Sequence, residues 1–243
     1  MIKIENTEVV GVEHAIRGMR NPKNSWDRSD SYEACIHGPC ETCRKTPEYP
    51  FNCEYFGSAE YVIGPNDHKL MMQLASGGPV HAKYRRMIAV YVDITAPLYW
   101  WKEFDTYKVG TVANSCSTMH KIHDKEFTLD DFSCEHLIST CLLEEIINEL
   151  NIYRGVYNNY DNQSEDYKKE FSKKEIWWQM IQLLPSSYNQ KRTVMLNYEV
   201  LVGMYTWRKN HKLDEWHEFC KWIESLPYSE LITGGNNAET HES

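Results

Sequence analysis

The sequence lacks the phosphate-binding signatures of the commonest nucleotide-binding folds. It contains neither a G-x-G-x-x-G stretch nor a Walker A stretch, so Rossmann and P-loop folds have no support. It also has no Ser-His-Asp or Cys-His signature of nucleophilic catalysis. Enzyme classes that depend on these motifs are therefore excluded as first interpretations.

Positive charge and long apolar runs are also scarce. The 243 residues include 26 Lys and Arg against 35 Asp and Glu, which gives a formal net charge of −9. Direct nucleic-acid binding is therefore not expected, although a local basic pocket is compatible with this charge. No run of roughly 18 apolar residues occurs, and Met1–Glu5 lacks the apolar core of a signal peptide. We expect a cytoplasmic protein with no membrane partner.

The composition is typical of a packed globular fold. Hydrophobic residues make up 42% and charged residues 25% of the chain, and its length suits one sizeable α+β domain or two small ones. Eight Trp and sixteen Tyr favour either an aromatic core or a site for flat ligands, and the core is the commoner use. The Gly-, Asn- and Glu-rich segment 233–243 is expected to be disordered.

The stretch from His81 to His120 carries the clearest local pattern. Residues 87–94 are mostly apolar and β-branched, which predicts a buried strand. Thr95-Ala96-Pro97 is a helix-start signal, because the missing N–H of Pro costs nothing in a first turn, and a helix is expected over Leu98–Lys108. The polar run Asn114–His120 then offers hydroxyl and backbone N–H groups to an anion.

A second informative stretch is Leu184–Trp216. One long helix is expected over Thr193–Lys209, in which Asn197 and Arg208 are eleven residues apart. At about 3.6 residues per turn, eleven residues make close to three turns, so both side chains would lie on one face. That face would offer an amide and a guanidinium to the same cleft. The alternative is a surface helix with a polar stripe.

Hydrophobic periodicity and capping signals predict the remaining elements. A strand is expected over residues 4–12, and a polar, mobile connection over residues 158–165. Thr128 is the expected N-cap of a helix, with Asp131 three residues further on. Helices are expected over residues 13–19, 66–76, 128–150, 170–184 and 214–226.

Eight cysteines require an interpretation. Without a secretory signal, a disulfide framework is not expected. Cys40 and Cys43 form a C-x-x-C pair with two further cysteines nearby, which would suit a tetrahedral zinc site, although the spacing matches no standard finger. Two alternatives stay open, a structural zinc site or a surface loop with reduced thiols. The four cysteines concerned are Cys35, Cys40, Cys43 and Cys53.

Three short patterns and one set of intervals give the chain a family resemblance. The patterns are Ala96-Pro97-Leu98-Tyr99, Lys102-Glu103-Phe104 and Asn114-Ser115-Cys116-Ser117. The intervals are those that separate Leu184-Pro185, Asn197 and Arg208. Together they resemble the flavin-dependent thymidylate synthase (thymidylate-synthase-complementing) family. The resemblance covers residues 66–120 and 180–220 well and the N-terminal part loosely.

The resemblance implies an α+β fold with a mixed sheet and packed helices, assembled as a homotetramer with active sites at subunit interfaces. One domain would span residues 1–232, with a Cys-rich insertion at 31–57. The family uses FAD, with NADPH as reductant and methylenetetrahydrofolate as the donor of a one-carbon unit to C5 of dUMP. The cofactor does the difficult chemistry, and the protein supplies orientation and charge without a nucleophile of its own.

The resemblance also implies roles for individual residues. An arginine-then-serine segment with Arg17, Arg20, Ser25 and Trp26 would help to hold the flavin phosphates; the alternative is an ordinary polar loop. The expected catalytic residues are Lys108, Ser117 and Arg208, and the expected substrate-binding residues are Lys102, Glu103, Ser115, Ser117 and Arg208. The expected cofactor-binding residues are Ser25, His81, Lys83, Arg86, Tyr107, Asn114, Asn197 and His211.

The chain departs from the family at its signature. Thr106-Tyr107-Lys108 stands where the family has Arg-His-Arg, Ser115 replaces a Glu, and Met119 replaces an Arg. Lys108 keeps one charge without the bidentate fork of Arg, so a nucleotide phosphate would have to be held differently. Three functions stay open: a divergent synthase or a related pyrimidine hydroxymethylase, an inactive relative that binds nucleotide or flavin or acts as a scaffold, and a zinc-dependent module.

Overall fold

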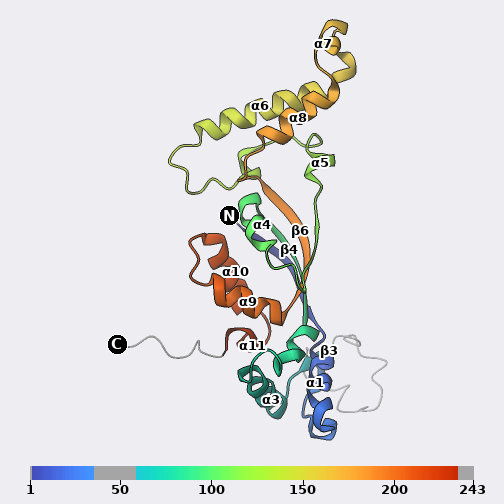
Figure 1. Ribbon diagram of the computed structural model, residues 1–243, viewed down its shortest axis with the longest axis vertical. Helices are drawn as coiled ribbons and strands as arrows, with labels where there is room; N and C mark the ends of the chain where they lie inside the picture. The colour runs from blue at the N-terminus through green and yellow to red at the C-terminus, as the bar shows by residue number, and fades with distance from the viewer. Residues whose placement is uncertain (1, 36–58, 235–243) are drawn as a thin grey trace. The chain divides into compact units, whose positions relative to one another are not determined.

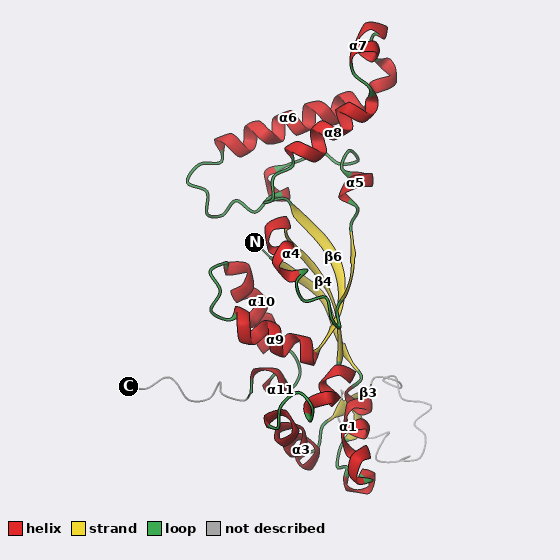
Figure 2. Cartoon of the chain, in the orientation of Figure 1, coloured by secondary structure: helices red, strands yellow, loops and turns green. Residues whose placement is uncertain are grey.

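The computed structural model describes residues 2–35 and 59–234 (Figure 1). The chain divides into two compact units. The first comprises residues 1–8, 91–196 and 206–223, and the second comprises residues 9–90, 197–205 and 224–243. Both contain helices, and the strands form one sheet of four and one of two (Figure 2). The α+β class expected from the sequence is therefore confirmed.

The larger sheet has the strand order β1-β4-β6-β5. Its strands are β1 (Lys3–Val10), β4 (Ala89–Pro97), β6 (Asn189–Asn197) and β5 (Val112–Ser115). In β4, Val90, Val92, Ile94 and Ala96 are all buried, which is the two-residue alternation of a strand with one face on the core. The strand predicted over residues 87–94 is thus real, but it begins two residues later and continues to Pro97.

A helix follows directly after both β4 and β6. After β4, α4 (Leu98–Phe104) begins at Leu98, as the sequence predicted, but Pro97 is its N-cap and does not lie in its first turn. The helix ends four residues before the expected Lys108. After β6, α9 spans Tyr198–Arg208. The single helix predicted over 193–209 is therefore wrong, because residues 193–195 pair in antiparallel register with β5.

This boundary changes the role of Asn197. Its side-chain Oδ1 accepts a hydrogen bond from the backbone N–H of Val200 at 3.1 Å, which satisfies one of the unpaired donors of the first helical turn. Asn197 is thus the last residue of a strand and caps the helix that follows. The prediction that Asn197 and Arg208 share one helical face is wrong.

The first unit contains a helical arm in which α6 (Cys141–Asn158) packs on α8 (Lys173–Leu183) (Figure 1). The helix predicted over 128–150 is wrong in its first half. Thr128 and Asp131 do form a capping box, but it closes only the 3₁₀ turn η4 (Leu129–Asp131). Phe132 then pairs in an isolated bridge with Tyr188, and these backbone bonds replace helical ones. The polar segment after α6 forms the short elements η5 (Tyr160–Asn162) and α7 (Glu165–Glu170).

Aromatic side chains build one of the two core clusters of the first unit. Between α4 and α10 (Asp214–Glu224), Trp100 is fully buried with its ring centroid 4.8 Å from that of Trp216. Trp101, Phe104 and Phe219 complete this cluster. A second cluster lies under the helical arm and consists of Ile122, Phe127, Phe132, Leu143, Ile147, Leu150 and Met180.

The second unit is built mainly from short helices. These are α1 (Val12–Arg20), α3 (Pro65–Ser76), α11 (Glu230–Thr233) and the 3₁₀ segments η1 (Asn21–Lys23), η2 (Trp26–Arg28) and η3 (Ala82–Met87). The antiparallel strands β2 (Tyr32–Cys35) and β3 (Ala59–Val62) accompany them. Gly11 permits the close packing of α1 on η3: its φ is +89°, and a Cβ there would lie 2.2 Å from the carbonyl oxygen of Met87.

The described residues test the zinc and membrane predictions only in part. Cys40, Cys43 and Cys53 lie outside the described residues, so the zinc site stays a prediction. Within residues 2–35 and 59–234, no three His, Cys, Asp or Glu side chains are placed to hold a metal ion. No helix in those same ranges is long and apolar enough to span a bilayer.

Candidate functional site

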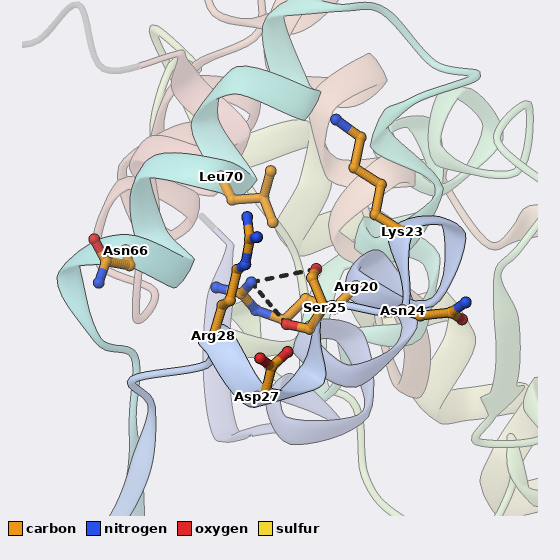
Figure 3. Close-up of a pocket in the computed structure, with 8 residues that line it drawn as sticks. All are labelled: Arg20, Lys23, Asn24, Ser25, Asp27, Arg28, Asn66 and Leu70. Atoms are coloured by element: carbon orange, nitrogen blue, oxygen red, sulfur yellow. Dashed lines mark hydrogen bonds between the residues drawn. The ribbon is translucent and has the colours of Figure 1, made fainter.

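A basic pocket with a volume of about 920 Å³ belongs to the second unit (Figure 3). Three cations and one carboxylate line it, so the charge balance of its wall favours an anionic ligand. Its polar donors include Ser25, which the sequence predicted as a flavin-binding residue. The lining residues are Arg20, Lys23, Asn24, Ser25, Asp27, Arg28, Asn66 and Leu70.

Turn chemistry after α1 brings these cations to one place. The helix ends at Arg20, and Pro22 is the middle residue of the short 3₁₀ segment η1 that follows. Asn24 then adopts a left-handed conformation with φ +47°, which few residues other than Gly, Asn and Asp adopt readily. The chain reverses at this point and enters η2, so that Arg20, Lys23 and Arg28 line the same cavity.

The floor of the pocket is a buried ion pair. Arg20 is 5% exposed and Asp67 is fully buried, and the Nε of Arg20 donates to the carboxylate of Asp67 at 2.5 Å. Arg20 also donates through Nη1 to the backbone oxygen of Ser25 at 3.1 Å, as the dashed lines of Figure 3 show. The other oxygen of Asp67 accepts hydrogen bonds from the hydroxyls of Ser29 and Ser31, at 2.6 and 2.7 Å.

These bonds keep Asp67 ionised inside the protein. Burial raises the pKa of this carboxyl group, but the hydrogen bonds from Ser29, Ser31 and Arg20 outweigh burial, so the pKa lies below its ordinary value of 3.8. The neighbouring Asp30 accepts from the backbone N–H groups of Asn66 and Asp67, which open α3. Arg20 and Asp67 therefore hold the pocket together.

Lys23 and Arg28 are the cations of this pocket that remain available to a ligand. Within the described part of the chain neither makes an ion pair, and both side chains are exposed. Asp27, on the same wall, offsets part of their charge. The sequence prediction included Arg20 and Ser25 but missed Lys23 and Arg28. The sequence feature that could have found them is the spacing of basic residues around Pro22 and Asn24, because these two residues reverse the direction of the chain.

Two other residues of the predicted flavin segment do not line the pocket. Arg17 is exposed on α1 and lies 3.8 Å from Glu13, one helical turn away. The indole of Trp26 is exposed and donates to the side chain of Asn21 at 2.8 Å. Arg17 is thus a suitable control for the basic residues that do line the cavity.

A second polar cluster lies within the first unit and is centred on Arg208. This arginine donates through Nη1 to Oε2 of Glu103 at 2.8 Å and through Nε to the hydroxyl of Tyr107 at 2.9 Å. Its guanidinium carbon lies 4.9 Å from the ring centre of Trp216, a distance typical of a cation–π contact. Two segments that carry the family resemblance therefore meet here.

Glu103 is the hub of this Arg208 cluster. Its Oε2 also accepts from the indole N–H of Trp216 at 2.9 Å and lies 3.3 Å from Nε2 of His211. The Arg208 side chain is 18% exposed, and its Nη2 makes no hydrogen bond to any described residue. This nitrogen can therefore donate to an anion from solvent.

The other predicted residues fall into separate places. In the first unit, Lys102, Lys108, Asn114 and Ser115 are exposed, and Ser117 caps α5 (Thr118–Lys121) by accepting from the backbone of His120. In the second unit, His81, Lys83 and Arg86 are exposed on or beside η3. Arg85, the third cation of the Lys83–Arg86 segment, is buried and lies 3.8 Å from Glu199. None of these residues belongs to the pocket or to the Arg208 cluster described above.

Comparisons with known proteins identify the fold. No family model and no curated protein sequence matches the chain. A crystal structure of the flavin-dependent thymidylate synthase ThyX from Helicobacter pylori, complexed with FAD and dUMP, is similar with a TM-score of 0.62 and 12% sequence identity. The match covers 96% of this chain and 98% of that one. Another crystal structure of thymidylate synthase X from the same organism, also with FAD and dUMP, has a TM-score of 0.61 at 13% identity and the same coverage. The chain thus shares the fold of these enzymes.

Proposed function

We propose that this protein is a flavin-dependent thymidylate synthase-like enzyme. It transfers a one-carbon unit from methylenetetrahydrofolate to C5 of dUMP, with FAD as the hydride carrier and NADPH as reductant. The observation that carries the proposal is the fold similarity over 96% of the chain to enzymes complexed with FAD and dUMP. The sequence resemblance, made from separate local motifs, supports the same assignment.

The basic pocket of the second unit fits the anionic part of FAD. Lys23 and Arg28 supply two cations without an internal partner among the described residues, and Ser25 supplies a hydroxyl beside them. Phosphate oxygens prefer such charged donors, and about 300–1,000 Å³ is the usual volume of a small-molecule site. Flavin, when bound, supplies hydride transfer. The task of Lys23, Ser25 and Arg28 is to bind and orient its phosphates.

The Arg208 cluster fits an anionic substrate group. The Nη2 of Arg208 offers donors to a nucleotide, while Glu103 holds the guanidinium in a fixed orientation through Nη1. Lys108 and Ser117 are the further residues we assign to substrate phosphate and catalysis, and His211 to the cofactor. Glu103 acts here through Arg208 as a positioning residue.

The first test is the visible spectrum of the purified protein, followed by release of tritium from C5-labelled dUMP in the presence of methylenetetrahydrofolate and NADPH. Flavin absorbance and dUMP-dependent turnover are expected. Arg28→Ala should lose flavin by about tenfold or more in affinity, because a charge-assisted phosphate contact contributes about 1.5–3 kcal/mol. Arg17→Ala, the matched control outside the pocket, should bind flavin normally. A colourless protein that takes up neither FAD nor dUMP would contradict the proposal.

A second candidate function is nucleotide and flavin binding without turnover. Tyr107 stands where the resemblance expects the His of Arg-His-Arg, and its hydroxyl accepts a hydrogen bond from Arg208. Binding of FAD and dUMP without tritium release would favour this candidate. Recovery of turnover after Thr106-Tyr107-Lys108 is changed to Arg-His-Arg would establish it. Mass analysis of any nucleotide product separates methylation from hydroxymethylation.

Assembly, location and zinc complete the proposal. We propose a homotetramer in the cytoplasm, which light scattering and cell fractionation would test. For the cysteine cluster, metal analysis of the wild type and of Cys40→Ser decides between a structural zinc site and free thiols. Zinc bound by the wild type and lost in Cys40→Ser would establish the site. Equal metal content in both would exclude it.

A further inference from the structure

Another cavity, in the first unit, contains none of the residues to which a role is assigned above. Its volume of about 450 Å³ lies within the range of about 300–1,000 Å³ that is usual for small-molecule sites. It lies against α10, and residues from the loop before α6 and from the segment before β1 complete it. We call it the α10 pocket. Its lining residues are Ile2, Glu135, His136, Asp214, Glu215, His217, Glu218 and Lys221.

The wall of the α10 pocket is acidic. Four carboxylates and one ammonium group line it, so the wall favours a positively charged ligand. Asp214 and Glu215 lie in the first turn of α10, where the helix dipole stabilises negative charge. The dipole explains why exposed acids stand at this end of the helix. It does not explain why one of them is buried.

Two exposed acids of the pocket already have partners on the protein. Two imidazoles flank Asp214, with Nε2 of His136 at 3.2 Å from Oδ2 and Nδ1 of His217 at 3.6 Å from Oδ1. Glu218 pairs with the ammonium group of Lys221 at 2.7 Å. These contacts hold the side chains of the wall in place, and such preorganisation lowers the ordering cost of binding.

Glu215 is the buried acid of the pocket, and it is only 8% exposed. Its Oε1 accepts a hydrogen bond from the hydroxyl of Tyr99. Burial, and then the bond to Glu215, raise the pKa of Tyr99, so this hydroxyl stays protonated and is the donor. The Oε2 of Glu215 makes no hydrogen bond within the part of the chain that the structure describes, and it is not sealed from solvent. A ligand in the cavity can therefore reach a buried, charged acceptor that lacks a donor.

We propose that the α10 pocket binds a small aliphatic amine. Its ammonium group donates to Oε2 of Glu215, the other carboxylates attract its charge, and its hydrocarbon chain lies against Ile2. A metal ion does not fit these observations, because no three His, Cys, Asp or Glu side chains among the described residues are placed to hold one. The inference does not depend on the proposed function, because no residue of this pocket has a role in it.

The experiment is calorimetric titration of the full chain with cadaverine, an aliphatic diamine. Two probes separate the features of the ligand: pentanol has the chain without the charge, and tetramethylammonium has the charge without an N–H donor. Each should bind at least about tenfold more weakly than cadaverine. N-acetyl-lysine amide presents the same ammonium group as a protein side chain would. It should also bind more weakly, because it lacks a second charge for the acidic wall.

The variant that tests the anchor is Glu215→Gln. It keeps the shape of the side chain and an acceptor for Tyr99 but removes the charge, so cadaverine should bind about tenfold more weakly or worse. The matched control is Glu224→Gln on the same helix, since Glu224 also accepts from a tyrosine hydroxyl, that of Tyr205 at 2.7 Å, but does not line the pocket. It should bind cadaverine like the wild type. Circular dichroism would verify that both variants fold.

The ranking of the probes on the wild-type protein decides the inference even if Glu215→Gln does not fold. Absence of cadaverine binding, or equal affinity for cadaverine and pentanol, would overturn it. Unchanged affinity in a folded Glu215→Gln variant would do the same. Tighter binding of N-acetyl-lysine amide than of cadaverine would also overturn it, because the pocket would then suit a lysine of a partner protein and not a small amine.

Discussion

The two arginines of the candidate sites are held by carboxylates in contrasting surroundings. In the second unit, Arg20 and Asp67 are 5% and 0% exposed. In the first unit, the side chains of Arg208 and Glu103 are 18% and 33% exposed. Both pairs join an arginine to a carboxylate. They differ in the other contacts that each partner makes and in how much water reaches them.

The contacts separate a structural role from a binding role. Asp67 has both oxygens engaged, and Arg20 directs donors to Asp67 and to the backbone of Ser25. Arg208 keeps Nη2 without a partner among the described residues. A buried pair that is fully satisfied is costly to break, whereas a half-exposed one can exchange partners with a ligand. The Arg20–Asp67 pair therefore stabilises its pocket, and Arg208 of the second pair can bind a substrate.

The sharpest way to break this comparison is Asp67→Ala. Removing the carboxylate leaves the Arg20 charge buried and unpaired, so we expect a loss of about 3–5 kcal/mol in the free energy of unfolding. Urea denaturation monitored by circular dichroism would measure it. The control is Glu13→Ala, which removes an exposed partner of Arg17 and should cost less than about 0.5 kcal/mol. Similar losses in both variants would refute the structural role of Asp67.

A pH profile sharpens the same comparison. Because the folded-state pKa of Asp67 is lowered, its stabilisation is complete above its ordinary pKa of 3.8 and is lost as the pH falls through the lower folded value. Below about pH 4, the wild type should therefore lose stability more steeply than Asp67→Asn. Urea midpoints measured across this range would show it. Parallel curves for the two proteins would contradict the assignment.

Asp93 provides a partly exposed counterpart for that profile. Hydrogen bonds from Thr193 and Asn6, with Lys191 at 3.1 Å, lower the pKa of this carboxyl group to about 2. Asp93→Asn should therefore flatten the profile only between the ordinary value of 3.8 and about 2. Above pH 4 the loss of stability in Asp93→Asn should be constant, because the stabilisation from Asp93 is fully present there, and it should be smaller than the loss in Asp67→Asn, whose side chain is fully buried.

Local patterns in the sequence were sufficient for much of the fold. The helix predicted over 66–76 is α3, and the change from strand to helix falls directly after Pro97, which ends β4 and is the N-cap of α4. Glu103, Tyr107, Arg208 and His211 were named from short motifs, and the structure brings all four together. Such motifs contain the residue types that form the site, even though the single helix predicted over 193–209 was wrong.

What the sequence could not predict depends on partners far along the chain. Thr193–Asn197 has no pattern that separates a strand from the first turn of a helix, and pairing with β5 decides it. Asp67 gave no local signal, since its partner Arg20 lies 47 residues away and the serines that hold it lie 36 and 38 residues away. Long-range contacts of this kind override local propensity.

The next largest effect is expected from Glu103→Gln. The amide keeps the shape of the side chain but loses the charge that holds Arg208 and His211, and we expect a loss of about 1–2 kcal/mol because the pair is partly exposed. Glu218→Gln is the control, since that carboxylate pairs with exposed Lys221 and should change stability by less than about 0.5 kcal/mol. A loss as large as that of Asp67→Ala would erase the distinction between the two pairs.

The smallest change is Tyr107→Phe, which removes one hydroxyl acceptor and leaves the ring beside Trp216. A single neutral acceptor contributes about 0.5–1.5 kcal/mol, and Glu103 still holds the guanidinium, so stability should fall by no more than this. The freed Nε of Arg208 becomes a further donor for a ligand, so the affinity for dUMP should stay equal or rise. Calorimetric titration would measure it. A loss of dUMP affinity would show that Tyr107 positions Arg208 for binding, and the half-exposed pair would then depend on its internal partners as strongly as the buried pair does.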